Sequence, residues 1–461
     1  MVIRLNRFLR AGALAVLICG APAVARAEGI ISAMTSAYLY SPTLMSALLD
    51  VKSAAENIAL RKAGKLPTIG ASASVSDQFA TSPTGLLSQQ SANLSLSYRQ
   101  TLFDNFQTDS QIEQARALVE LSTHALTNQE QNVLLSVVQA YMNVVRDTQL
   151  VALRQENVSF FDAQVSSANE RLRIGEGTRI DVSQAEARRA QAVASYRAAI
   201  ASLQTSQASF QRYVGHKAQG LRAEFPYPKM LPKSIEKAIS LAESRHPAIL
   251  SARAAIRAAQ AGSDSARAAF GPTLNLIGQV CALCFSASSN SPTTSVTSTA
   301  SVQLQLTIPI YAGGALGAGV RKANIEQIQS EVDALAARDQ VRESVISAWA
   351  SLQNATAQIE SAQSAVSSGQ LVLQGVIQER DVGQQTTLDV LNAQAEVTQA
   401  REGLIQAQSA RVIASFALIA ATGRLTARDL GLNVGILKDE GEKYAAKVED
   451  VWQELRALDD E

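Results

Sequence analysis

One sequence pattern that occurs twice constrains this chain more than any other feature. The pattern Gly-x-x-Thr-x-x-Asp-Val-x-x-Ala lies at residues 175–185 and again at residues 383–393, with every matched position offset by 208. The glycine can take the left-handed conformation that ends a helix. The threonine three residues later can cap a new helix, and the aspartate three residues further on can complete a capping box. The sequence therefore predicts two helical hairpins with their tips at these patterns.

Each predicted tip follows an unusually long helix. Residues 106–173 contain neither proline nor glycine, and a helix of this length would span roughly 100 Å. Such a helix must pack along other helices, because a compact core cannot bury it. We expect it to lie against a return helix at 180–214, stacked end to end on a shorter helix at 44–65. The corresponding helices of the second half are predicted at 315–382, 388–422 and 247–270.

Four segments between the helices alternate apolar and polar residues, which is the period of a strand with one apolar face. These segments are residues 69–75, 94–98, 274–280 and 302–310. We expect strands of roughly ten residues, long enough to cross a bilayer when tilted. The Ser- and Thr-rich segments at 81–85 and 286–299 are predicted as loops, and residues 78–92 and 286–299 are expected outside the cell. A half-buried sheet in a soluble protein is the alternative interpretation of the same alternation.

The amino terminus has the features of a secretory signal. Residues 1–27 combine three early arginines, an apolar stretch and the small-x-small sequence Ala25-Arg26-Ala27. The mature chain is therefore expected outside the cytoplasm. We divide it into a first structural repeat at 28–233, a second repeat at 234–422, and a C-terminal region with an acidic tail at 423–461. No apolar run in the mature chain approaches the roughly 20 residues of a membrane helix.

Composition argues against two classes of function. The chain has 41 basic and 41 acidic residues, and four of the basic residues lie in the predicted signal, so a nucleic-acid partner is not expected. The three histidines, His124, His216 and His246, fall on different predicted elements, so no catalytic set is apparent and we do not expect an enzyme. No cofactor is expected either.

The four predicted strands imply that several chains assemble together. Four strands cannot close a barrel, a membrane does not tolerate open sheet edges, and outer-membrane barrels have at least eight strands. Three chains would supply twelve strands, and closed cyclic symmetry is the common solution for homo-oligomers. The predicted fold is mainly α-helical with a β-barrel shared by three chains, continued by a tube of helices.

Two cysteines of the mature chain, Cys281 and Cys284, form a Cys-x-x-Cys sequence. One such pair is weak evidence for a metal, because a structural zinc site needs four ligands. A disulfide is favoured in an exported protein. We therefore predict a disulfide near the outer rim of the barrel and no metal site.

The doubled tip pattern, the Leu-Pro-Thr-Ile sequence at 66–69 and the Thr422-Gly423 helix end together resemble the TolC-type outer-membrane efflux family. The resemblance covers essentially the whole mature chain. It implies a homotrimer with a twelve-stranded outer-membrane barrel and a periplasmic helical tunnel. It also implies work with a periplasmic adaptor and an inner-membrane pump of the RND or ABC type, in export of drugs or in type I secretion of proteins.

The same resemblance implies roles for residues at the tips. The adaptor-contacting tips would be formed by Gly175, Thr178, Gly383 and Thr386. The periplasmic gate would involve Asp181, Arg380, Gln385, Asp389 and Asn392. Asn392 stands where the family often has an aspartate, and Arg380 stands where an aromatic residue is common, so the resemblance does not extend to cation selectivity at the constriction. We expect an ion pair between Asp181 and Arg380 that holds the tube shut.

A second class of protein is compatible with the helical hairpins alone. A periplasmic coiled-coil adaptor, or a structural protein without a channel, would also contain long antiparallel helices. An adaptor would have one hairpin and a lipoyl-like β domain, whereas this sequence predicts two hairpins and four amphipathic strands.

Overall fold

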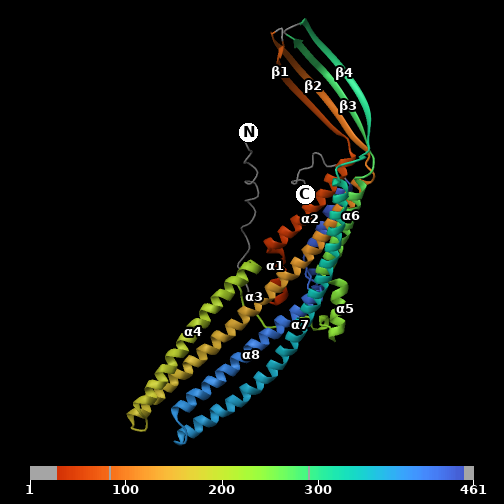
Figure 1. Cartoon of the computed structure of the whole chain (residues 1–461). Helices are drawn as coiled ribbons and strands as arrows, with labels where there is room; N and C mark the ends of the chain where they lie inside the picture. Colours follow the sequence, from red (N-terminus) through yellow and green to blue (C-terminus); the bar gives the residue numbers. More distant parts are fainter. Residues whose placement is uncertain (1–27, 83–84, 289–290, 451–461) are drawn as a thin grey trace, which may run out of the picture.

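The computed structural model describes residues 28–450 apart from 83–84 and 289–290, so the predicted signal and the last residues of the acidic tail lie outside it. A β-sheet lies at one end of the molecule, the two hairpin tips lie at the other, and long helices connect them (Figure 1). The fold is therefore mainly helical with one sheet, as predicted.

The order helix, two strands, long helix, return helix occurs twice along the chain. The first series consists of α1 (Ile30–Tyr40), α2 (Pro42–Lys62), a 3-10 turn η1 (Ala63–Lys65), β1 (Thr68–Ser82), β2 (Gly85–Phe103), α3 (Gln107–Arg173) and α4 (Arg179–Val214). The second consists of η2 (Pro228–Met230), α5 (Ile235–Arg245), α6 (Pro247–Ala268), β3 (Thr273–Ser288), β4 (Ser291–Thr307), α7 (Ala315–Asp381) and α8 (Thr387–Ala421). The short helices α9 (Ala427–Leu430) and α10 (Leu437–Asp450) follow.

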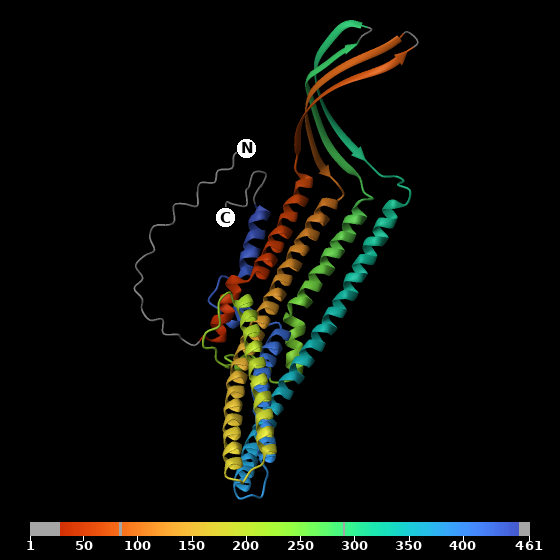
Figure 2. The ribbon, with the colours of Figure 1, turned by 90° about the vertical axis from the view of Figure 1, so that its left-hand side faces the viewer.

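The long helices pack as their lengths require. Helices α3 and α7 have 67 residues each, and at 1.5 Å per residue both extend for about 100 Å. Helix α3 lies along α4 in its lower part and along α2 in its upper part, while α7 lies along α8 and α6 in the same way (Figure 2). The predicted stacking of a return helix and a shorter helix against each long helix is confirmed.

The strands are longer than the sequence suggested. They have 15, 19, 16 and 17 residues and form one antiparallel sheet in the order β1-β2-β3-β4. The predicted loops at 81–85 and 286–299 are therefore wrong over most of their length, because β1 pairs with β2 from Thr68↔Arg99 to Ser82↔Gly85 and β4 begins at Ser291. Serine and threonine are frequent in loops, but they also fit a ladder whose backbone groups are paired across the hairpin.

The lower end of β4 also differs from the prediction. The strand ends at Thr307, whereas the alternation of branched residues continues to Ile310. Pro309 follows two residues after the strand end, and a proline lacks the backbone N–H that a ladder needs. Ile310 is consequently outside the sheet and 96% exposed.

The sheet has one apolar and one polar face. Val75, Leu96, Val302 and Leu304 project from the apolar face and are 50–86% exposed in the single chain. On the other face Ser72 hydrogen-bonds Ser95, and Ser76 hydrogen-bonds Ser91, each at 2.8 Å. A soluble protein would normally cover such an apolar face, so the exposed face calls for lipid or another protein.

The largest buried cluster lies halfway along the molecule, where α1, α3, α4 and α8 meet. We call it the waist cluster; its fully buried members include Met34, Leu134, Tyr141, Phe210 and Phe416. Phe225 stacks edge-on against Phe416 with 5.2 Å between the ring centroids. The segment that connects the two halves is thereby fixed to the last long helix.

Helix α8 corrects one expectation about membrane helices. Within the part of the chain that the structure describes, α8 alone is long and apolar enough to span a membrane. In the fold, 44% of its most apolar stretch is buried, and Phe416 and Ile419 belong to the waist cluster. Core packing therefore accounts for part of this apolar sequence.

Candidate functional site at the hairpin tips

Both tips end a long helix in the predicted way. Gly175 and Gly383 have φ angles of 84° and 77°, a region that a side chain disfavours. The next residue donates its backbone N–H back into the helix, from Glu176 to the carbonyl of Arg171 at 2.9 Å and from Gln384 to that of Glu379 at 2.8 Å. These contacts satisfy carbonyl groups that a helix end otherwise leaves without partners.

Both return helices begin with the predicted capping box. Thr178 accepts from the Asp181 backbone N–H at 3.2 Å, and the Asp181 carboxylate accepts from the Thr178 backbone N–H at 2.9 Å. In the second tip the corresponding distances between Thr386 and Asp389 are 3.3 and 2.9 Å. The hydrogen bonds from the threonine hydroxyl and backbone lower the pKa of Asp181, and likewise that of Asp389. Both carboxylates therefore stay ionised to lower pH than an ordinary aspartate does.

The predicted ion pair between Asp181 and Arg380 is not present within the described protomer. The Arg380 guanidinium instead donates to the carboxylate of Asp381 at 2.7 Å and to the side-chain oxygen of Gln164 at 2.8 Å. Its side chain is only 11% exposed. Arg380 lies on the last turn of α7 and packs against α3, whereas Asp181 is used by its own helix cap. Arg380 is therefore a bridge between the two hairpins.

The structure brings further side chains together between the hairpins. Asn392 on α8 accepts a hydrogen bond from Arg188 on α4 at 3.0 Å. Arg154 on α3 donates to Glu402 on α8 at 2.8 Å, and burial raises the pKa of Glu402. These contacts, together with the contact of Arg380, form a set that we call the hairpin bridges. They connect α3 and α4 of the first hairpin to α7 and α8 of the second.

A buried polar cluster completes the hairpin bridges. The Gln394 side-chain nitrogen donates to the Asn157 side-chain oxygen at 3.1 Å, and the Thr398 hydroxyl donates to the same oxygen at 3.1 Å. All three residues are less than 9% exposed. Sequence reasoning missed this cluster. Polar residues spaced by four on α8 were visible, but their burial depends on which helix packs against them.

The other predicted site residues are placed without a bridging role. Gln385 lies exposed in the second tip. Cys281 and Cys284 lie far from the tips, in β3, where they are disulfide-bonded with 6.0 Å between their Cα atoms. Over residues 28–450, with the two gaps noted above, no group of three or more His, Cys, Asp and Glu residues is arranged to hold a metal.

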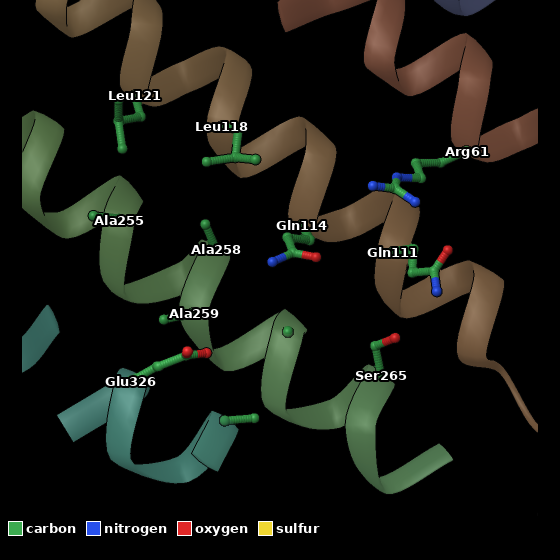
Figure 3. Close-up of a pocket in the computed structure, with 12 residues that line it drawn as sticks. Arg61, Gln111, Gln114, Leu118, Leu121, Ala255, Ala258, Ala259, Ser265 and Glu326 are labelled. Atoms are coloured by element: carbon green, nitrogen blue, oxygen red, sulfur yellow. The ribbon is translucent and has the colours of Figure 1, made fainter. Parts of the chain in front are cut away.

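Two of the hollows between the helices are alternative candidate sites. One of about 350 Å³ lies beside the hairpin bridges and is lined by Arg154, Phe161, Arg188 and Glu402 among others. The other, of about 440 Å³, lies between α3, α6 and α7 near the sheet (Figure 3). Small residues of α6, among them Ala255, Ala258, Ala259 and Gly262, form much of its wall. Ser265 on α6 and Glu326 on α7 also line this second hollow, but the Glu326 carboxylate pairs with Lys322 on its own helix at 3.5 Å. The hollow therefore fits a packing groove between helices better than an active site.

The long paired hairpins, the capped tips and the sheet with an exposed apolar face define the fold class of this protein, in which two long helical hairpins are joined to a four-stranded sheet. The sequence matches the family described as "Outer membrane efflux protein" over residues 34–216 and 238–424. The chain belongs to this family, which confirms the resemblance seen in the tip patterns. Membership supports a location in the outer membrane.

Individual relatives agree with this assignment. The chain is 36% identical to the outer membrane efflux protein BepC of Brucella suis over 450 residues, covering 97% of each chain. It is 26% identical to the alkaline protease secretion protein AprF of Pseudomonas aeruginosa, covering 68% of this chain and 66% of that protein. Its fold is similar to the CmeC outer membrane channel of Campylobacter jejuni, with a TM-score of 0.76 at 16% identity and coverage of 90% and 89%.

Proposed function

We propose that this protein is the outer-membrane export duct of a tripartite system. In this proposal three copies form a twelve-stranded barrel in the outer membrane and a helical tunnel in the periplasm. A periplasmic adaptor and an inner-membrane pump of the RND or ABC type supply the cargo. The observation that carries the proposal is a four-stranded sheet with an exposed apolar face and two free edges, on the same chain as two helical hairpins.

The sheet edges argue for closure by further copies. Strands β1 and β4 lie at the two ends of the sheet order, and each is bonded on one side in the protomer. An open edge in lipid leaves backbone groups without partners, which a membrane does not tolerate. Pairing of β1 with β4 of the next copy removes both edges at once. The polar face with its serine pairs would then line the water-filled lumen.

The helices next to the sheet support the same ring. Helices α2, α3, α6 and α7 lie side by side in that order, which parallels β1 to β4 (Figure 2). The outermost helices each expose an apolar stripe: Met45, Leu49 and Leu60 on α2, and Ile325, Ile328, Val332 and Leu335 on α7. Contact between α7 of one copy and α2 of the next would bury both stripes. Such a head-to-tail contact closes into a ring when its rotation fits.

The tips are proposed as the gate and the adaptor-contacting end. Gly175, Thr178, Gly383 and Thr386 shape the two turns at the end of the tube. The hairpin bridges connect the first and second hairpins of a protomer. Opening the tube would require the second hairpin to move relative to the first, so the bridges would oppose it.

The relatives suggest two alternative classes of cargo, small molecules and proteins. BepC is named for efflux and AprF for secretion of a protease, and a duct of one shape serves either purpose. We propose that the pump sets the choice between toxic small molecules and proteins.

Reconstitution and gene deletion test the proposal. Purified protein added to a planar bilayer should give stepwise ion conductance. A deletion strain should become more susceptible to detergents, dyes and antibiotics, or lose a secreted protein from its medium, and the intact gene should restore the lost property. Protein that gives no conductance steps in any bilayer, together with a deletion strain indistinguishable from its parent, would refute the export function.

A further inference from the structure

The disulfide Cys281–Cys284 lies at an irregularity in β3. The pairing register of β3 shifts there relative to both neighbouring strands, β2 and β4. Ser95 of β2 pairs with Cys281, but the next residue of that ladder, Leu94, pairs with Leu283. On the other side Thr299 of β4 pairs with Cys281 and Thr297 pairs with Cys284. Strand β3 therefore contains one residue more than either neighbour at this point. This extra residue is Ala282, and the arrangement is a β-bulge.

The disulfide is compatible with the bulged strand and incompatible with a regular one. In a regular strand, residues three apart lie about 10 Å apart and point to opposite faces. A disulfide needs Cα atoms within about 4.4–6.8 Å. The Cα atoms of Cys281 and Cys284 are 6.0 Å apart, and both residues pair with members of the polar face, Ser95 and Asn93. The bond therefore requires the extra residue in β3.

A side chain of the neighbouring strand completes the bulge. The Ser298 hydroxyl donates to the carbonyl of Ala282 at 2.9 Å. The carbonyl of the unpaired residue thus has a partner, which a bulge in a ladder would otherwise lose.

The bulge decides which face the outer half of β3 presents. With Ala282 set aside, Leu283 lies opposite Leu94, and Phe285 lies opposite Ala92 and Val296, all on the apolar face. A one-residue slip would turn these two large side chains to the polar face and Ser286 to the apolar face. The neighbouring part of β4 is rich in serine and threonine on both faces. A strand that is polar on both faces specifies its register weakly.

From these contacts we propose that the Cys281–Cys284 disulfide is a register lock for the outer half of the sheet. The bond holds Ala282 outside the ladder, and it thereby keeps Leu283 and Phe285 on the face that meets lipid. The hydrophobic pattern sets the register in the lower half of β3, and the disulfide sets it where that pattern weakens. This proposal rests on the proposed function, in which the apolar face of the sheet inserts into lipid.

The test compares two backgrounds without native cysteines. The first carries Cys281→Ser and Cys284→Ser, and the second carries the same changes plus deletion of Ala282. Without the extra residue a regular strand keeps every residue from Leu283 onward on its native face, so no lock is needed. A single reporter thiol, from Phe285→Cys or Ser286→Cys, is introduced into each background. The reporter is then labelled with a water-soluble maleimide in lipid vesicles.

The register lock predicts different labelling in the two backgrounds. In the deletion background Ser286→Cys should react at least about tenfold faster than Phe285→Cys, because only the polar face meets water. In the background that retains Ala282 this ratio should fall toward one or invert. The variant that lacks the cysteines but retains Ala282 could also fail to assemble. If deletion of Ala282 then restores assembly, that result also supports the register lock. A high ratio in both backgrounds, a low ratio in both, or failure of both to assemble would overturn it.

A matched pair on β1 separates this proposal from the proposed function. Ser74→Cys and Val75→Cys lie on opposite faces of a strand whose ladder with β2 is regular. Their labelling ratio should be high in both backgrounds if the apolar face lies in lipid. A low ratio on β1 would count against membrane insertion of the sheet. A high ratio on β1 with unchanged β3 labelling would count against the register lock alone.

Discussion

Arg380 has different partners in the structure from the one that the sequence predicts. Its position near the second tip suggested a pair with Asp181, but its guanidinium binds Asp381 and Gln164. The partner could not be predicted from the sequence, because Gln164 is 216 residues away and is brought close only by the packing of α7 on α3. The capping role of Asp181 could be predicted, because a capping box involves residues three apart.

Replacing Arg380 tests the hairpin bridges. Arg380→Ala removes a largely buried contact of a charged group, a type of bond whose loss costs about 1.5–3 kcal/mol. We expect the single-channel conductance of purified protein to rise several-fold while assembly is unchanged. The control is Arg173→Ala, which removes an ion pair with Glu170 inside one helix at the other tip. Equal conductance for Arg380→Ala and the unmodified protein would place the gate elsewhere.

Glu130 should give the protein an unusual dependence of stability on pH. Its carboxylate is 4% exposed and accepts from the Ala427 backbone N–H at 2.5 Å. Burial is the main cause that raises the pKa of Glu130 to about 7. Among nearby charges, Asp429 raises this pKa further, whereas Lys438 and Arg428 lower it. Tyr38 faces the same carboxylate. The folded protein binds the proton of Glu130 more tightly than the unfolded chain does, so protonation of Glu130 favours the folded state. This contribution is full below the ordinary pKa of 4.5 and is lost as pH rises towards 7.

The variant Glu130→Gln checks this dependence. The glutamine oxygen can keep the bond to Ala427 and carries no charge. The unmodified protein should melt at lower temperature at pH 8 than at pH 5, and the fall should be clearly smaller in the variant. Parallel melting curves for the two proteins across this range would show that Glu130 does not titrate as described.

At the scale of elements, the helices were predictable and the strand lengths were not. Helix ends are fixed by nearby residues, so Gly175 and Thr178 marked a tip to within a residue or two. The strands extend through Ser- and Thr-rich sequence because each hairpin partner supplies hydrogen bonds that a single sequence does not reveal. The bulge at Ala282 was hidden for the same reason, although the two cysteines marked its place.

The cap of α4 gives a prediction that separates stability from gating. Asp181→Ala should remove one side of the capping box and destabilise the start of α4 by about 1 kcal/mol. Amide exchange near Thr178 should accelerate about fivefold, the equivalent of that free energy, while conductance stays unchanged. Glu186→Ala, an exposed change on the same helix, serves as the control. Increased conductance in Asp181→Ala would assign this aspartate to the gate as well.

For the whole molecule, the central claim is that three copies close head to tail, with α7 of one beside α2 of the next. The pairing follows from the parallel order of helices and strands and from the two exposed stripes. The sequence predicts several chains but does not indicate which surfaces they would share. The proposed contact could be assigned only from the fold, which leaves Leu49 and Leu335 more than half exposed.

Cross-linking between these two helices is the most direct measurement. Leu48 packs near Leu126 of α3, and the 208-residue offset puts Leu335 of α7 at about the height of Leu126. A chain with Leu49→Cys and Leu335→Cys, treated in membranes with a short bifunctional maleimide, should give bands of one, two and three chains and nothing larger, because a closed ring of three has no free ends. Each single variant should remain monomeric on the denaturing gel. A series that stops at two chains, or that extends beyond three, would contradict the trimeric duct.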